Sequence, residues 1–265
     1  MSKPVLHFVH ANSYPTGTYQ KFFDALDSHY AIQALPMHAH DARYPIKGGW
    51  RELSEELVAD IVARNKKPVI LVGHSMGGIL SLLAAKARPD LVRGVVLLDA
   101  PIVAGWRALA VRISRNTAFA ERFSPAQQSV KRRNLWPDAE SAFEHFASKE
   151  MFAKWAPEVL RDYIEHGLVP HPEGVTLRFT REAETAVYLA LPDNIDTLVW
   201  PTFPVPVGFI GGDNSAECRM AGMGATRRLV GANFRQIKGG HLFPMESPKL
   251  AADTTHELIQ SMFPK

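Results

Sequence analysis

The sequence predicts an α/β protein with a mostly parallel sheet of about six strands, helices on both faces of the sheet and a helical cap. Over most of the chain, short apolar runs typical of strands buried on both faces alternate with segments of helical periodicity. This alternation implies right-handed crossovers and a parallel sheet. It stops once, between residues 102 and 167, where helical patterns follow one another without a strand. Such an excursion indicates a cap over the strand ends, where open parallel sheets bind ligands.

The first part of the chain supplies four of the expected strands. They are expected at residues 3–9, 30–35, 69–72 and 92–98. Helices are expected between them at residues 19–26, at 50–65 and from 76 onward. The helix at 50–65 places Leu53, Leu57, Ile61 and Val62 at the spacing that lines one face, so it is expected to pack on the sheet.

The second part of the chain contains the expected cap and the rest of the sheet. Cap helices are expected at 106–119, 126–134 and 138–155. Then follow a brief extended piece at 175–178, a helix at 181–191, strands at 205–210 and 234–237, and helices at 218–230 and 248–263. These positions divide the chain into a core of residues 1–101 and 170–265 and a cap of residues 102–169.

The composition is that of an ordinary globular protein. The chain has 265 residues, 46% of them hydrophobic and 22% charged, which suits one domain with an insertion. A net charge of +3 with only two short basic runs argues against a nucleic-acid partner. Cys218 is the single cysteine, which excludes an internal disulfide and fits a reducing compartment. Because no apolar run reaches membrane-spanning length and no secretion signal is recognisable, we expect a cytoplasmic monomer or homodimer with no membrane partner.

A glycine-flanked serine is the first candidate catalytic residue. Gly73-His74-Ser75-Met76-Gly77 is a G-x-S-x-G motif between a buried strand and an apolar helix rich in small residues. Such a turn holds the serine in a strained conformation that leaves no room for side chains two residues before and after it. The helix beginning at Met76 directs its free amides toward any oxyanion formed beside Ser75. Ser75 is therefore the predicted nucleophile.

An activated serine needs a base, and His241 is the candidate. It lies in the glycine-rich loop Gly239-Gly240-His241, directly after the last expected strand. Because parallel strands end at the same sheet edge, this loop is expected close to Ser75.

At these residues the chain resembles the α/β-hydrolase superfamily over nearly its whole length. The segment 73–77 is similar to the family's nucleophile elbow, and 239–241 to its histidine loop. His10-Ala11-Asn12 is similar to the His-Gly-x segment after the first core strand, with Ala11 where glycine is usual. The resemblance implies an oxyanion hole formed by the amides of Asn12 and Met76. It implies no cofactor and no catalytic metal.

Three carboxylates are candidates for the acid that orients His241. Asp99 follows the strand at 92–98, where some relatives carry their acid, and is the first choice. Asp213 follows the penultimate strand, which is the commoner position in the family. Alignment of Gly212 with the family's glycine at the strand end, however, puts Ser215 at the expected acid position. Glu217, a little further along the chain, is therefore a third candidate.

A serine at the centre of the elbow predicts acyl transfer. We expect a carboxylesterase-like hydrolase of small to medium apolar esters, because the cap is rich in aromatic residues. A thioesterase, a lactonase and a C–C bond hydrolase use the same catalytic parts, and a non-catalytic ligand-binding protein of this fold is the alternative from another class. The loop His38-Ala39-His40-Asp41 superficially suggests a metal site, but further ligands at a matching spacing are not recognisable. The expected partner is thus a small-molecule substrate.

Overall fold

The computed structural model describes residues 3–105, 107–108, 125–192, 194–199 and 202–264. Six strands form one sheet in the order β2-β1-β3-β4-β8-β9, and every neighbouring pair is parallel. The strands are β1 (Val5–Val9), β2 (Ala31–Ala34), β3 (Val69–His74), β4 (Val92–Leu98), β8 (Val207–Gly212) and β9 (Phe234–Ile237). This arrangement confirms the predicted fold class.

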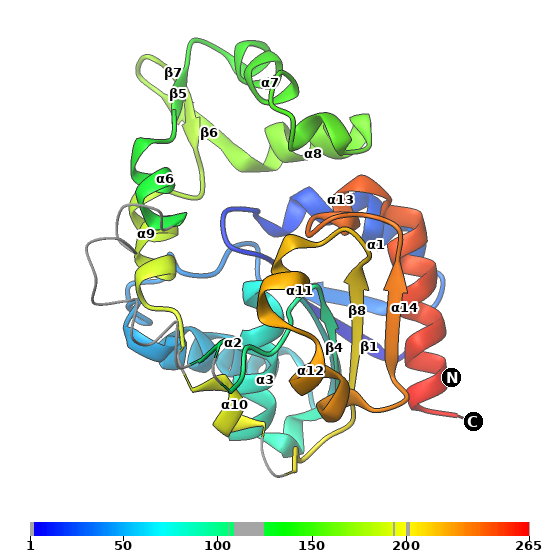
Figure 1. Cartoon of the computed structure of the whole chain (residues 1–265). Helices are drawn as coiled ribbons and strands as arrows, with labels where there is room; N and C mark the ends of the chain where they lie inside the picture. The colour runs from blue at the N-terminus through cyan, green and yellow to red at the C-terminus, as the bar shows by residue number, and fades with distance from the viewer. Residues whose placement is uncertain (1–2, 106, 109–124, 193, 200–201, 265) are drawn as a thin grey trace.

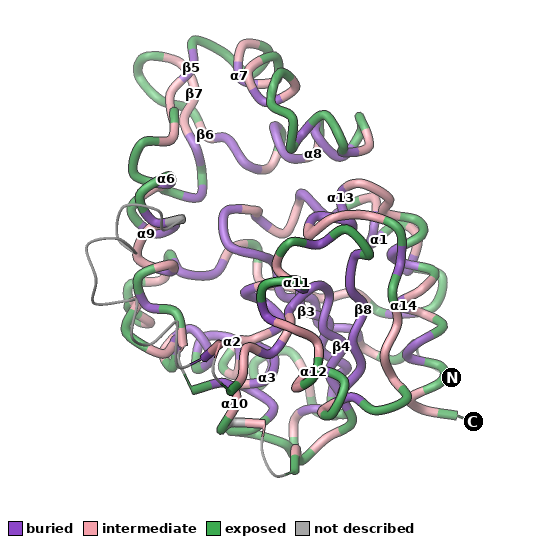
Figure 2. Tube along the Cα trace, in the orientation of Figure 1, coloured by how far each residue is buried: buried purple, intermediate pink, exposed green. Residues whose placement is uncertain are grey.

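The central strand shows why the sheet is covered on both faces. All six residues of β3 are buried. Ile70 and Val72 contribute to one hydrophobic core, whereas Val69 and Leu71 contribute to the other. Successive side chains of a strand point to opposite faces, so an uninterrupted apolar run requires a helical layer on each side. Figure 2 shows β3, β4 and β8 buried along most of their length.

Two helical layers meet this requirement (Figure 1). One core contains residues of α1 (Gln20–Leu26) and α14 (Pro248–Met262). The other contains residues of α2 (Arg51–Arg64), α3 (Met76–Ala87) and α12 (Gly224–Val230). The remaining short elements of this part are η1 (Thr16–Tyr19), η2 (Gly48–Trp50), η3 (Pro89–Leu91), α11 (Ala216–Ala221) and α13 (Phe243–Glu246). The helix predicted at 218–230 is thus two helices, separated at Gly222, which has a φ of +71°.

Between β4 and β8 the chain leaves the sheet and forms a separate group of elements. In Figure 1 the distal part of this group, with α7 and α8, lies beyond the ends toward which β8 and β9 point. Its described elements are α6 (Pro125–Lys131), β5 (Leu135–Trp136), α7 (Ala139–Ala147), η4 (Phe152–Lys154), α8 (Pro157–Gly167), β6 (Leu168–His171), β7 (Gly174–Leu177), α9 (Arg181–Leu189) and α10 (Ile195–Leu198). The helix expected at 106–119 lies outside the described residues, except for residues 107–108.

The prediction that residues 102–167 contain no strand is wrong. Strand β5 pairs with β7, and β7 with β6, to form a small antiparallel sheet. A two-residue strand is too short to show any periodicity, which is why the sequence pattern missed it. The predicted helix at 138–155 is also broken, into α7 and the short η4. The division into core and cap stays a prediction, and the small sheet spans its boundary at residue 169.

None of the described helices is long and apolar enough to cross a membrane.

Candidate active site

The turn between β3 and α3 holds Ser75 in a strained backbone conformation. Its φ is +52° and its ψ is −114°, a region that non-glycine residues rarely adopt. A Cβ atom at position 73 would lie 2.2 Å from the Gly77 carbonyl oxygen, and one at position 77 would lie 2.0 Å from the Val9 carbonyl oxygen. Both glycines are therefore required for the turn, as the motif predicts.

Ser75, His241 and Asp99 form a continuous hydrogen-bonded chain. Nε2 of His241 lies 3.0 Å from Oγ of Ser75, and Nδ1 lies 2.7 Å from Oδ2 of Asp99. Ser75 follows β3, Asp99 follows β4 and His241 follows β9, so one sheet edge brings together residues up to 166 positions apart. An ionised carboxylate only accepts hydrogen bonds, so Nδ1 carries the imidazole proton and Nε2 presents its lone pair to the serine hydroxyl.

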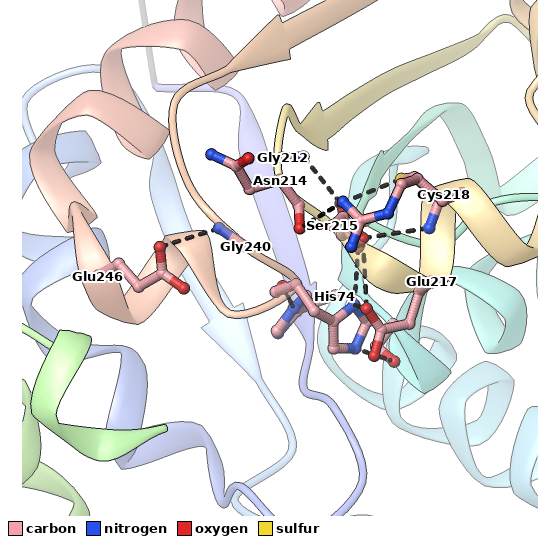
Figure 3. A network of polar contacts seen from close by, with 12 residues as sticks. His74, Gly212, Asn214, Ser215, Glu217, Cys218, Gly240 and Glu246 are labelled. Carbon is pink, nitrogen blue, oxygen red and sulfur yellow. Dashed lines mark hydrogen bonds and ion pairs between the residues drawn. The ribbon is translucent and has the colours of Figure 1, made fainter. Parts of the chain in front are cut away.

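The carboxylate of Asp99 is fully buried and receives hydrogen bonds on both oxygens. The Gly212 amide donates to Oδ1 at 2.8 Å, the Ser215 hydroxyl to Oδ2 at 2.6 Å and the Cys218 thiol to Oδ1 at 3.3 Å. Figure 3 labels Gly212, Ser215 and Cys218 within this network of polar contacts. Burial alone would raise the pKa of Asp99, but the bonds from His241, Ser215 and Gly212 hold that pKa below its usual range.

The environment of His241 has the opposite effect on its imidazole. Burial favours the neutral ring, but the hydrogen bond to Asp99 and the negative charges of Glu217, Asp99 and Glu246 raise the pKa of His241 above its ordinary value. The ring is thus placed to accept a proton and to be stabilised as a cation.

The structure does not bring Asp213 to the imidazole. Its Oδ1 accepts hydrogen bonds from the Gly239 amide at 3.0 Å and from the Asn214 side chain at 3.1 Å. Asp213 is exposed and fixes the loop that leads to His241. Asp213 therefore contacts the backbone of the histidine loop and not the imidazole.

Glu217 reaches the same side of the ring but does not hydrogen bond to it. Its Oε2 lies 3.7 Å from Nδ1 of His241 and 3.3 Å from Oγ of Ser215, whose proton points to the nearer Asp99 oxygen at 2.6 Å. Its side chain is 42% exposed. Among the three acid candidates, Asp99 is therefore the one that is both buried and hydrogen bonded to the imidazole.

The loop after β1 brings Asn12 to the same site. Ala11, Asn12, Ser75, Met76 and His241 all line one cavity. The Ala11 amide donates to the Tyr19 hydroxyl at 3.2 Å, and the Asn12 side-chain amide donates to the Glu184 carbonyl of α9 at 3.2 Å. The left-handed residue of this loop is Ser13, with a φ of +77°, so alanine at position 11 does not strain the backbone.

Two cavities meet at Ser75 and His241. The first has a volume of about 310 Å³ and is mainly apolar, with Trp50, Ile79, Val103, Leu191, Pro192 and Ile195 in its wall. The second, of about 810 Å³, is more polar and includes Glu150, Lys154, Asn214, Glu217 and Glu246. Sequence reasoning missed the apolar wall, because its residues come from separate segments and share no local pattern.

Mutual packing is the role expected for any single cap aromatic, although some of them were also expected to face the pocket. Phe146, Phe152, Trp155 and Tyr163 pack on one another with ring centroids 4.6–5.8 Å apart. Trp136 joins them in the same core cluster. Among the described aromatics of the predicted cap, none lines either cavity at Ser75. Trp106, Phe119 and Phe123 lie outside the described residues.

The only metal-ligand geometry in the described part of the chain belongs to this same site. Ligand atoms of Asp99, Glu217 and His241 lie within 4.8 Å of one another. The 2.7 Å contact between Asp99 and His241 is a hydrogen bond, and donors already occupy both oxygens of Asp99. His38 and His40 belong to no such group: the first bonds to Glu56.

Comparison with known proteins identifies the family. Residues 8–254 match the alpha/beta hydrolase family, so the chain belongs to it. A stretch of 108 residues is 32% identical to lipase LipV of Mycobacterium tuberculosis, and one of 100 residues is 28% identical to a "Putative esterase/lipase" of Haemophilus influenzae. These matches cover 40% and 37% of this chain but only 35% of the length of either relative.

A solved structure supports the fold. E-2-(Acetamidomethylene)succinate hydrolase superposes with a TM-score of 0.76 at 20% identity, which covers 98% of this chain and 92% of that one. Identity this low shows a shared fold and carries no further statement about the reaction.

Proposed function

We propose that this chain is a serine hydrolase that cleaves small to medium, apolar ester-type substrates through an acyl-enzyme. The observation that carries the proposal is the hydrogen-bonded chain from Ser75 through His241 to buried Asp99, which opens on an apolar cavity. The matched segments of an esterase/lipase and a lipase agree with this class of reaction.

In the first step, Ser75 attacks the substrate carbonyl carbon. Nε2 of His241 takes the hydroxyl proton, because its lone pair faces Oγ at 3.0 Å. The oxyanion receives hydrogen bonds from the backbone amides of Met76, at the start of α3, and Asn12. Asp99 keeps the ring oriented and stabilises the imidazolium that forms.

In the second step, the leaving group takes the proton from His241 and departs, which leaves an acyl group on Ser75. Water then attacks the ester carbon while His241 accepts a proton from it. Collapse of the second tetrahedral intermediate returns the proton to Oγ and releases the acid. Side chains, backbone amides and water supply the groups that this proposed cycle uses.

The apolar cavity sets the proposed substrate size. A volume of about 310 Å³ lies at the lower end of the range of about 300–1,000 Å³ for small-molecule sites. It suits a short aliphatic or single aromatic group, whereas the more polar cavity suits the rest of the ester.

A series of p-nitrophenyl esters with increasing acyl length tests this proposal. We expect turnover by the wild type to pass through a maximum at short to medium chains, and Ser75→Ala to abolish it. Absence of turnover on every ester by folded protein would instead favour a ligand-binding protein of this fold. Equal turnover at all chain lengths would contradict the proposed role of the apolar cavity.

A further inference from the structure

The residue before the nucleophile, His74, connects the catalytic segments behind the site. Its ring is fully buried. Nε2 lies 2.9 Å from the backbone carbonyl oxygen of His241, and Nδ1 lies 2.8 Å from the hydroxyl of Tyr19. Tyr19 is 1% exposed, and its hydroxyl is also the acceptor for the Ala11 amide. Figure 3 labels His74 within the same polar network as Ser215 and Glu217.

Every proton in this network has one possible position. A carbonyl oxygen only accepts, so Nε2 of His74 must carry the proton that it shares with His241. Burial lowers the pKa of His74 to about 3, so the ring is neutral and Nδ1 has a lone pair. Tyr19 must therefore donate to Nδ1, and its oxygen accepts from the Ala11 amide. The bonds thus run in one direction, from Ala11 through Tyr19 and His74 to the carbonyl of His241.

These bonds join the three segments that carry the proposed catalytic parts. Ala11 precedes the oxyanion-hole residue Asn12, His74 precedes Ser75, and the carbonyl belongs to His241 itself. We propose that Tyr19 and His74 are positioning residues that set the imidazole of His241 and the amide of Asn12 relative to Ser75. This inference rests on the proposed serine hydrolase function.

The local backbone explains why His241 needs this second attachment. Gly239 has a φ of +141°, and Gly239 and Gly240 give the loop more conformational freedom than other residues would. Asp213 and Glu246 hold the amides of these glycines at 3.0 and 2.9 Å. His74 donates a hydrogen bond to the backbone carbonyl oxygen of His241, which follows Gly240. Asp99 accepts a hydrogen bond from the ring of His241. Loss of the His74 bond therefore frees the backbone of His241, and a displacement of about 1 Å costs about 100-fold in rate.

Two amide substitutions at position 74 separate positioning from packing. In His74→Gln the side-chain nitrogen replaces Nε2 and still reaches the His241 carbonyl. In His74→Asn the nitrogen replaces Nδ1 and falls short of it. We expect His74→Asn to lower kcat on a p-nitrophenyl ester by about 100-fold at unchanged KM, and His74→Gln to stay within about tenfold of the wild type. Circular dichroism and thermal unfolding confirm that both variants fold.

A spectroscopic readout keeps this test independent of activity. The proton on Nδ1 of His241, shared with Asp99, should give a downfield proton NMR resonance in the wild type and in His74→Gln. It should broaden or disappear in His74→Asn. If the wild type shows the resonance but no ester turnover, the proposed function fails while the positioning claim is still decided by the resonance.

Two results overturn the inference: equal loss of kcat in the two variants, or a folded His74→Asn that keeps both its resonance and its kcat. If His74→Asn does not fold, Tyr19→Phe replaces it. That variant keeps the ring contact with Phe8, whose centroid lies 4.6 Å away, and removes only the hydroxyl. We then expect kcat to fall at unchanged KM, and an unchanged kcat overturns the inference.

Discussion

At the scale of single residues, the site depends on one buried charge. A buried carboxylate is costly unless it is paired and hydrogen bonded. Asp99 meets this condition through His241, Gly212, Ser215 and Cys218. Its local surroundings, rather than its place in the sequence, therefore support Asp99 as the acid of the proposed mechanism.

Asp99→Asn should lower kcat/KM by about 10⁴-fold. An asparagine amide that donates to Nδ1 of His241 forces the imidazole proton onto Nε2. This change removes the lone pair that faces Ser75. Asp213→Asn is the matched control. Its side-chain oxygen still accepts from the Gly239 amide, so we expect little change. The measurement is steady-state hydrolysis of one ester by both variants. Equal losses in the two would show that Asp99 has been assigned the wrong role.

At the scale of elements, neighbouring strand ends explain how Asp99 and Ser215 converge. Strands β4 and β8 are parallel neighbours with Leu98 opposite Ile210. The Asp99 amide continues the pairing by donating to the Ile210 carbonyl at 2.8 Å. Asp99 and Ser215, which are 116 positions apart in sequence, therefore meet just beyond the ends of adjacent strands, and their side chains lie 2.6 Å apart.

An exchange of these two residues should move the acid to the other strand. Asp99→Ser is expected to be nearly inactive, and Asp99→Ser combined with Ser215→Asp should recover at least about tenfold of the lost kcat/KM. Ser215→Asp alone should reduce activity, because two close carboxylates raise the pKa of one of them. Ester hydrolysis by the three variants decides the matter. A folded double variant no more active than Asp99→Ser would rule out convergence on a shared acid position.

At the scale of the whole molecule, the sequence predicted the sheet better than the site. Every strand of the large sheet was expected within a few residues, because buried apolar runs are a local signal. Strand β5 was not, since two residues carry no period. The hydrogen bond between Asp99 and His241 could not be predicted either, because it joins residues 142 positions apart. Choosing among three carboxylates required the packing of loops after three different strands.

Buried histidines should make the folded protein sensitive to acid. Burial lowers the pKa of His7, His10 and His74 from 6.5 to about 3. Below pH 6.5 the unfolded chain takes up protons at these rings and the folded chain does not, so each ring destabilises by up to about 1.4 kcal/mol per pH unit. The raised pKa of His241 has the opposite effect, since it stabilises the folded protein below about pH 6.5. It is one group, however, whereas three buried rings have a lowered pKa.

The urea midpoint should therefore be lower at pH 5 than at pH 7.5. His7→Gln removes one titrating ring and should reduce this pH dependence. A midpoint that is equal or higher at pH 5 would show that these rings are not kept neutral by the fold.

The proposed mechanism requires that Ser75 is an activated nucleophile. The most direct measurement is labelling of the wild type with a fluorophosphonate probe, followed by mass spectrometry of the intact protein and its peptides. We expect one adduct, on the peptide that contains Ser75, and none in Ser75→Ala. Folded wild-type protein that stays unlabelled, or a label that persists in Ser75→Ala, would contradict it.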